Sequence, residues 1–195
     1  MTETHNTPVQ PGTRSNFRFT HAAELFEEIP EIAEDVTARP EGHTCDEFIR
    51  ALVGSRTPEE AITFSAFVLP RRFAVWWGHE CLKQIESTLD PHDLRMLELA
   101  AEWVGDPEEE SRYAALDAAM ESDAKTPGVW IAFGAGWSGG SMVGPELPPV
   151  PPAPHLTARA VNAGVLSVLA RVDVSERIEQ LDRFARMAIR IGTEE

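Results

Sequence analysis

Four capping residues, each directly followed by a proline, constrain the fold of this chain most strongly. The pairs are Thr57-Pro58, Asp90-Pro91, Asp106-Pro107 and Thr126-Pro127. Proline is favoured at the first position of a helix, where its missing N–H group leaves no hydrogen bond unmade. Thr and Asp side chains before it accept hydrogen bonds from the first N–H groups. Each pair therefore predicts the start of a helix, and Thr57 with Glu60 also has the spacing of a capping box.

The apolar residues between these starts follow the helical period. One face of the segment after Pro91 carries Leu94, Leu97, Ala101 and Val104. The sequence therefore predicts an all-α fold, with seven to nine helices in a single domain. The predicted ranges are 21–36 (broken at Pro30), 45–53, 58–68, 71–87, 91–104, 107–122, 127–135, 155–171 and 175–191.

A glycine-rich stretch contains two overlapping motif matches. Gly134, Gly136 and Gly139 fit the dinucleotide-binding pattern, and a nucleophile-elbow pattern is centred on Ser138. Both motifs require a strand before the glycines and a helix directly after them. Six of the residues 145–154 are proline, which removes backbone donors and prevents a helix there. We therefore expect neither a nucleotide cofactor nor an elbow, and interpret the glycines as a turn that ends a helix.

The proline segment, residues 145–154, is expected to adopt the extended polyproline II conformation. Its PxxP spacing is one that aromatic-lined grooves bind. Because predicted helices hold both of its ends, we expect a strap that crosses the domain and packs on Trp137. One groove would remain along the edge of this strap. In the alternative, Trp137 is exposed and anchors a binding partner.

The two ends of the chain differ in expected order. Residues 1–18 are polar and predict a flexible N-terminal tail. Residues 19–195 form the predicted helical domain, in which residues 138–154 are a Gly/Pro-rich loop.

No apolar run approaches the roughly 20 residues of a membrane helix, and no secretory signal is recognisable. With only two cysteines, these features indicate a cytoplasmic protein that does not insert into membranes.

The formal net charge of −15 argues against nucleic acid as a partner, because such binding depends on neutralising phosphates. The acidic surface, richest at residues 24–35, has two interpretations. It either keeps the chain well solvated or faces a basic protein partner.

Metal binding is not predicted. The one suggestive triplet is His79-Glu80-Cys81, but residues two apart on a helix are rotated by about 200°. His79 and Cys81 would therefore face nearly opposite directions, and Lys83 stands where a zincin would have its second histidine. We expect no metal and no other cofactor.

Several blocks of sequence carry a resemblance to other proteins. They are LPRR at 69–72, AVWW at 74–77, AEWV at 101–104 before Asp106-Pro107, GWSGGS at 136–141 and PPAPHLTARAV at 151–161. With these blocks, the chain resembles a family of uncharacterised bacterial proteins that are often encoded in type VI secretion gene clusters. The resemblance implies an intracellular accessory to the secretion machine, such as an adaptor or chaperone for spike or effector proteins. It implies no activity or catalytic residue.

We therefore expect a non-catalytic protein that binds a secretion spike, an effector or a toxin. One alternative is an acidic immunity protein that neutralises a basic toxin. Another is a serine hydrolase with Ser138 as nucleophile and His155 as base. The residues expected at the partner-binding surface are Trp76, Trp137, Ser138, Pro151, Pro152, His155 and Arg159.

The sequence has no residues at the spacing of metal ligands and no nucleotide motif between a strand and a helix. This leads to a first prediction. Adding EDTA, NAD or ATP should leave the thermal midpoint unchanged, because a ligand that binds only the native state must raise it. Differential scanning fluorimetry measures this directly. An upward shift with NAD or ATP, or a downward shift with EDTA, would contradict the interpretation of the glycines and histidines.

Overall fold

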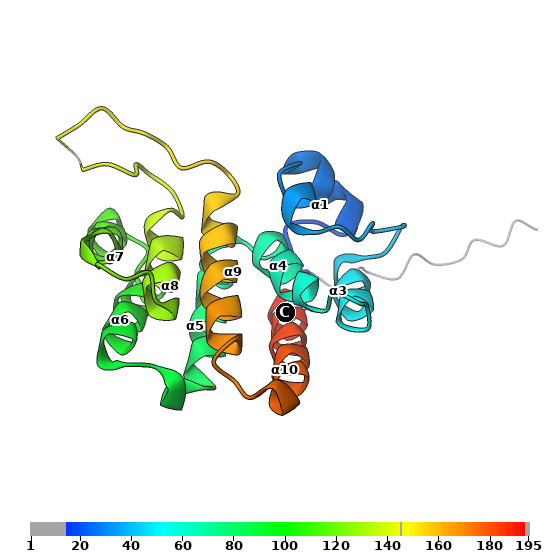
Figure 1. Cartoon of the computed structure of the whole chain (residues 1–195). Coiled ribbons are helices and arrows are strands. Elements are labelled where there is room, and N and C mark those ends of the chain that lie inside the picture. The colour runs from blue at the N-terminus through cyan, green and yellow to red at the C-terminus, as the bar shows by residue number, and fades with distance from the viewer. Residues whose placement is uncertain (1–14, 145, 194–195) are drawn as a thin grey trace, which may run out of the picture.

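The computed structural model describes residues 15–144 and 146–193 of the chain. Within these residues the fold is all-α and forms a single domain (Figure 1). The predicted fold class is thereby confirmed. The described segments contain ten α-helices and one short 3₁₀ helix: α1 (Ala22–Glu28), α2 (Ile32–Asp35), α3 (Cys45–Val53), α4 (Glu59–Val68), α5 (Arg71–Lys83), η1 (Glu86–Thr88), α6 (Pro91–Gly105), α7 (Glu109–Glu121), α8 (Pro127–Gly136), α9 (Leu156–Leu169) and α10 (Val174–Thr193).

The helix starts follow the proline pairs with two differences. Asp90 caps α6 by accepting a hydrogen bond of 2.8 Å from the Asp93 N–H, and α8 begins at Pro127. In contrast, α7 begins at Glu109 with Glu108 as its N-cap, so Asp106 does not cap it. The helix α4 begins at Glu59, one residue later than expected.

The predicted capping box of Thr57 and Glu60 does not form, since the Thr57 N–H donates to the Ser55 Oγ at 3.1 Å. Glu60 has other main partners. Its carboxylate accepts hydrogen bonds from the Thr37 Oγ1 at 2.6 Å and from the Thr37 and Ala38 N–H groups at 3.1 Å. Burial raises the pKa of this carboxyl, but these hydrogen bonds lower it more, so the net pKa lies below its usual value. Glu60 therefore fastens the segment after α2 to α4.

The helix α8 lies at the centre of one half of the fold. Nine of its ten residues are buried, and it packs against α5, α6, α7 and α9. Glycines let these helices approach closely. A Cβ atom added at Gly78 of α5 or at Gly164 of α9 would lie 2.8 Å from the Ile131 Cδ1 of α8. Gly134, one of the glycines that match the rejected dinucleotide pattern, is likewise inside α8 and faces Val161.

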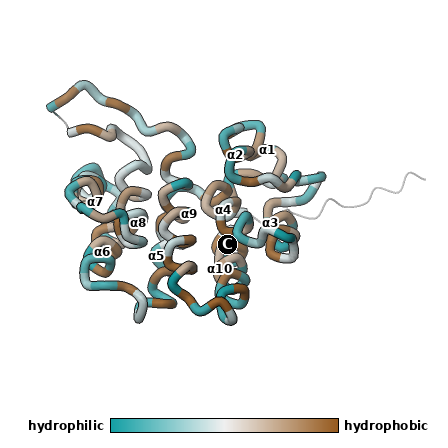
Figure 2. The backbone as a smooth tube through the Cα atoms, in the orientation of Figure 1, coloured by the Kyte–Doolittle hydropathy of each residue, from teal (hydrophilic) through white to brown (hydrophobic). Residues whose placement is uncertain are grey.

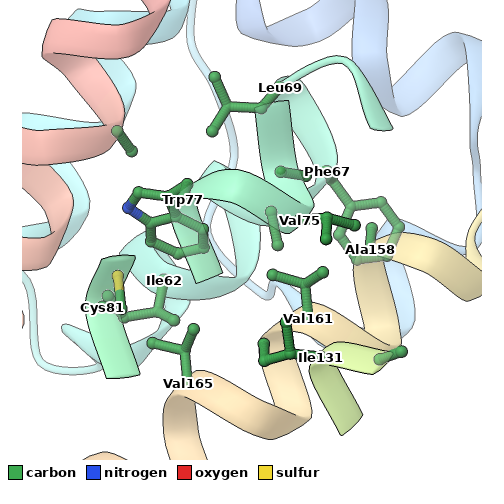
Figure 3. Packing of buried hydrophobic residues seen from close by; sticks show 14 of the residues in the cluster. Ile62, Phe67, Leu69, Val75, Trp77, Cys81, Ile131, Ala158, Val161 and Val165 are labelled. Carbon is green, nitrogen blue, oxygen red and sulfur yellow. The ribbon is translucent and has the colours of Figure 1, made fainter. Parts of the chain in front are cut away.

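A second set of packed side chains joins this half to α4 and α10. The fully buried Trp77 of α5 donates a hydrogen bond of 3.0 Å from its indole N–H to the Phe184 carbonyl of α10. Figure 3 shows its ring close to Cys81 and Ile62, which are also buried. Burial raises the pKa of the Cys81 thiol well above its usual value, so it stays protonated and packs as an apolar group.

The described part of the predicted N-terminal tail, residues 15–18, is attached to the domain. The Asn16 N–H donates to the Gly192 carbonyl of α10 at 2.7 Å, and the Arg18 N–H donates to the Val68 carbonyl at 3.0 Å. Phe17 packs against the core beside Gly192. Residues 15–18 of the predicted tail are therefore held by α4 and α10. Residues 1–14 and 194–195 lie outside the described residues.

Close packing at the start of α8 predicts a strong effect of one methyl group. A Cβ atom at Gly128 would lie 2.7 Å from the Asp93 Cα, and backbone atoms move less easily than side-chain ends. Gly128→Ala should lower the free energy of unfolding by about 3 kcal/mol, measured by urea denaturation.

Gly105→Ala is the matched control. Gly105 ends α6 without a positive φ, and an added Cβ would meet nothing within 4 Å. It should stabilise by up to about 1 kcal/mol, because alanine restricts the unfolded chain. Equal effects of the two substitutions would refute the close contact of α8 with α6.

Candidate protein-binding site

The connection between α8 and α9 projects beyond the helices as a long loop (Figure 1). Its base is held by side chains that donate to main-chain carbonyls. The Arg71 Nη1 of α5 donates to the Ser138 carbonyl, and the Thr157 Oγ1 of α9 donates to the Trp137 carbonyl, both at 2.8 Å. Three different helices contribute such donors, since α7 supplies a third set.

Arg112 of α7 makes the largest contribution. Its guanidinium Nη1 donates to the Gly136 carbonyl at 2.7 Å and to the Ser141 carbonyl at 3.0 Å. Its Nε and Nη2 bind the Glu109 carboxylate at 2.8 and 2.7 Å. The hydrogen bond with Glu109 raises the pKa of Arg112, whose side chain is only 2% exposed. Gly140, at φ +59°, lies against this guanidinium where a Cβ would collide with it.

Near the tip, hydrogen bonds join the outgoing and returning parts of the loop. The Met142 N–H donates to the Val150 carbonyl at 2.8 Å, and the Val150 N–H donates to the Ser141 Oγ at 3.0 Å. The Tyr113 hydroxyl of α7 donates to the Val143 carbonyl at 3.1 Å. Pro145, expected in the strap, lies outside the described residues. In its described part, the loop is therefore held by hydrogen bonds at its base, and its tip projects from the helices.

A groove of about 520 Å³ separates this tip from α7, and we call it the loop groove. Met120 and Leu147 are exposed on its two sides, at 60% and 53%, and Val150 lies in the same loop at 43%. Figure 2 shows apolar residues along this projecting loop. The residues that line the groove are Tyr113, Leu116, Asp117, Met120, Met142, Val143, Gly144, Glu146 and Leu147.

Comparison with known proteins covers this whole region. The model of a family of unknown function matches residues 48–192. The chain belongs to that family, DUF6931. Every residue of the loop groove lies within the DUF6931 match, whereas α1 and α2 precede it. No similar chain was found among curated proteins or among solved structures.

Within the DUF6931 region, the structure contradicts the predicted packing of the strap on Trp137. Trp137 is half-buried, and its ring packs on Phe133 with centroids 4.6 Å apart. Pro148, Pro149 and Pro151 are exposed and Pro152 is half-buried, so the loop does not close over the body. The reason is that donors from α5 and α7 bind the carbonyls of the loop base and direct the chain outward. A groove does run along the loop, but α7 forms its other side.

His155 and Arg159 are engaged within the chain. The Arg159 guanidinium binds Asp35 through Nε and Glu34 through Nη2, both at 2.7 Å. These hydrogen bonds raise the pKa of Arg159. The His155 Nδ1 lies 3.6 Å from the Glu31 Oε1. Arg159 therefore attaches α2 to α9, and His155 lies beside the same segment without a hydrogen bond between its Nδ1 and any described residue. Both residues were expected at a partner surface.

Trp76 lies on α5 and does not line the loop groove. Its ring is 37% exposed and stacks on His79 with centroids 5.1 Å apart. Sequence reasoning missed the residues of α7 that do line the groove. Tyr113, Leu116 and Met120 have the spacing i, i+3, i+7 of one helix face, which was a usable signal.

The arrangement does not favour the hydrolase alternative. Within residues 15–144 and 146–193, no hydrogen bond joins the Ser138 Oγ to His155, a contact expected of a nucleophile and its base. Ser138 also follows a helix, whereas an elbow follows a strand.

The described residues include no group of three or more His, Cys, Asp or Glu side chains that could hold a metal ion. No described helix is both long and apolar enough to cross a membrane.

If Arg112 holds the base of the loop, replacing it should destabilise the loop. Arg112→Met keeps much of the side-chain volume but leaves the Gly136 and Ser141 carbonyls without their donor. The free energy of unfolding should fall by about 3 kcal/mol, as when one partner of a buried polar group is removed. Amide exchange at Met142 and Val150 should also accelerate.

Arg95→Met is the control, because Arg95 is 60% exposed on α6 and forms a surface ion pair with Glu98. It should change stability by less than about 0.5 kcal/mol, as surface ion pairs do. If the amides of the loop exchange at the same rate in both variants, Arg112 does not fix the loop.

Proposed function

We propose that this DUF6931 protein is a non-catalytic binding protein whose contact surface is the loop groove. The observation that carries the proposal is the exposure of Met120 and Leu147 on two sides of one groove, with Val150 exposed in the same loop. Gathered apolar side chains at a surface are typical of protein interaction sites. The hydrogen bonds at the loop base support this, because a loop that is already ordered loses less entropy on binding.

The chemistry of the groove suits a protein partner. Met120 and Leu147 offer apolar area, and flexible methionine side chains adapt to the shape of an inserted group. Asp117 and Glu146 line the same groove and would favour basic residues at the edge of that partner. The adaptor or chaperone role in type VI secretion is our proposal from the resemblance alone, since DUF6931 is described only as a family of unknown function.

An immunity protein is the second candidate, favoured by the net charge of −15. Such a protein would hold one toxin domain through complementary charge and would release it very slowly. An adaptor, in contrast, would bind a spike or effector and exchange it. The identity of the bound protein and its dissociation rate therefore separate these two roles.

The proposal predicts a position-specific contact in the native host. A photo-crosslinking amino acid replaces Leu147, and in a control protein it replaces Arg95, which is exposed on α6 outside the groove. We expect a discrete protein adduct from position 147 that does not form from position 95. Introducing Met120→Asp should lower its yield at least about fivefold, since a charge would enter an apolar contact.

Met120 is exposed, so this substitution should leave the thermal midpoint within about 2 °C of the parent. Identical adducts from both positions would contradict the proposal. So would an adduct from position 147 whose yield does not respond to Met120→Asp.

A further inference from the structure

A second groove lies between α3 and α10, on the side of the molecule away from α7 (Figure 1). Its volume is about 540 Å³. Arg50 of α3 and Arg186 and Arg190 of α10 line it, and we call it the arginine groove. Its apolar lining comes from Val53, Ala185 and Ile189.

The lining of this groove is richer in arginine than the chain as a whole. The protein has 17 Lys and Arg residues against 32 Asp and Glu residues. Among the described residues that line the groove there are three arginines and one carboxylate, Asp182, and a second carboxylate, Asp46, pairs with Arg50 beside the groove. A concentration of guanidinium groups on so acidic a chain indicates a site for a negatively charged partner.

The two best-defined arginines have donors to spare. Arg50 pairs with Asp46 through Nη1, and Arg186 pairs with Asp182 through Nη2, each with its neighbour one turn away. Their side chains are 58% and 77% exposed. Exposed pairs of this kind add little stability, and a guanidinium carries five donors. Carboxylates of a partner can therefore bind without removing a strong internal contact.

The length of the groove corresponds to about three turns of a helix. Its lining residues on α10 run from Asp182 through Ile189 to Thr193, about three helical turns or roughly 16 Å. Apolar residues line it together with the arginines, and Ala185 and Ile189 are themselves buried. A helix with one apolar face and acidic residues beside that face matches both features.

We propose that the arginine groove binds an acidic amphipathic helix of a partner protein. This site does not depend on the loop groove, because α3 and α10 supply none of the residues that line the latter. Apolar side chains of the partner lie over Val53 and Ile189. Its carboxylates pair with Arg50 and Arg186, which sets its orientation.

The test uses a fluorescein-labelled synthetic peptide of about 16 residues, with leucines on one helical face and glutamates beside them, titrated with the full chain. A second peptide carries lysine in place of every glutamate. Fluorescence anisotropy should report binding of the acidic peptide with a Kd below about 100 µM, weakening as salt rises. The lysine peptide should bind at least about tenfold more weakly to this groove.

The variants separate this groove from the general charge of the protein. Arg50→Glu with Arg186→Glu should raise the Kd of the acidic peptide at least about tenfold. The control, Arg95→Glu with Arg183→Glu, makes the same charge change at two exposed, paired arginines outside the groove. It should raise the Kd less than about threefold.

If the groove variant melts early, Arg50→Gln with Arg186→Gln replaces it and should show the same order of effects. Three results would overturn the proposal. They are the absence of acidic-peptide binding, equal binding of the lysine peptide, and an equal loss in both double variants.

Discussion

The burial of α8 on nearly all sides is the constraint on which the rest of the structure depends. A helix enclosed by four others must let their backbones come close, and glycines on α5, α8 and α9 allow this. Ile131 fills the space left by Gly78 and Gly164, so three helices meet at one side chain. Because α8 is enclosed, its backbone meets polar side chains of other helices at its two ends.

The start of α8 is fixed by a buried carboxylate. Asp93 of α6 is fully buried, and its Oδ1 accepts a hydrogen bond of 2.7 Å from the Gly128 N–H. Its Oδ2 accepts a hydrogen bond of 3.1 Å from the Arg171 guanidinium, which also donates to the Thr88 carbonyl. A buried carboxylate is tolerated when it is paired and hydrogen-bonded, as here through both of its oxygens. Arg112 has the corresponding role at the other end, where it directs the loop away from the helices.

Local signals in the sequence predicted most of the fold. The predicted range 45–53 is the observed α3, and the expected break at Pro30 separates α1 from α2. Caps, prolines and periodicity act within one helical turn, so they can be read without knowing the tertiary structure. Glu60, Arg112 and Asn16 bind main-chain groups 22 or more residues away, and no local pattern specifies such a partner. For the same reason, the sequence predicted the loop but not the helix beside it. The prolines were expected to pack on Trp137, whereas the groove along the loop is lined by α7.

The two proposed grooves differ in chemistry and in position. Exposed apolar residues with carboxylates beside them form the loop groove on α7, and guanidinium groups over an apolar floor form the arginine groove on α3 and α10. Since different helices build them, one partner can occupy the loop groove while another occupies the arginine groove. An immunity protein needs only one such surface, because it acts by covering a single toxin. An adaptor needs two surfaces of unlike chemistry, so that its two partners do not compete for the same site. If both grooves bind as proposed, the adaptor role therefore explains more of this surface than the immunity role does.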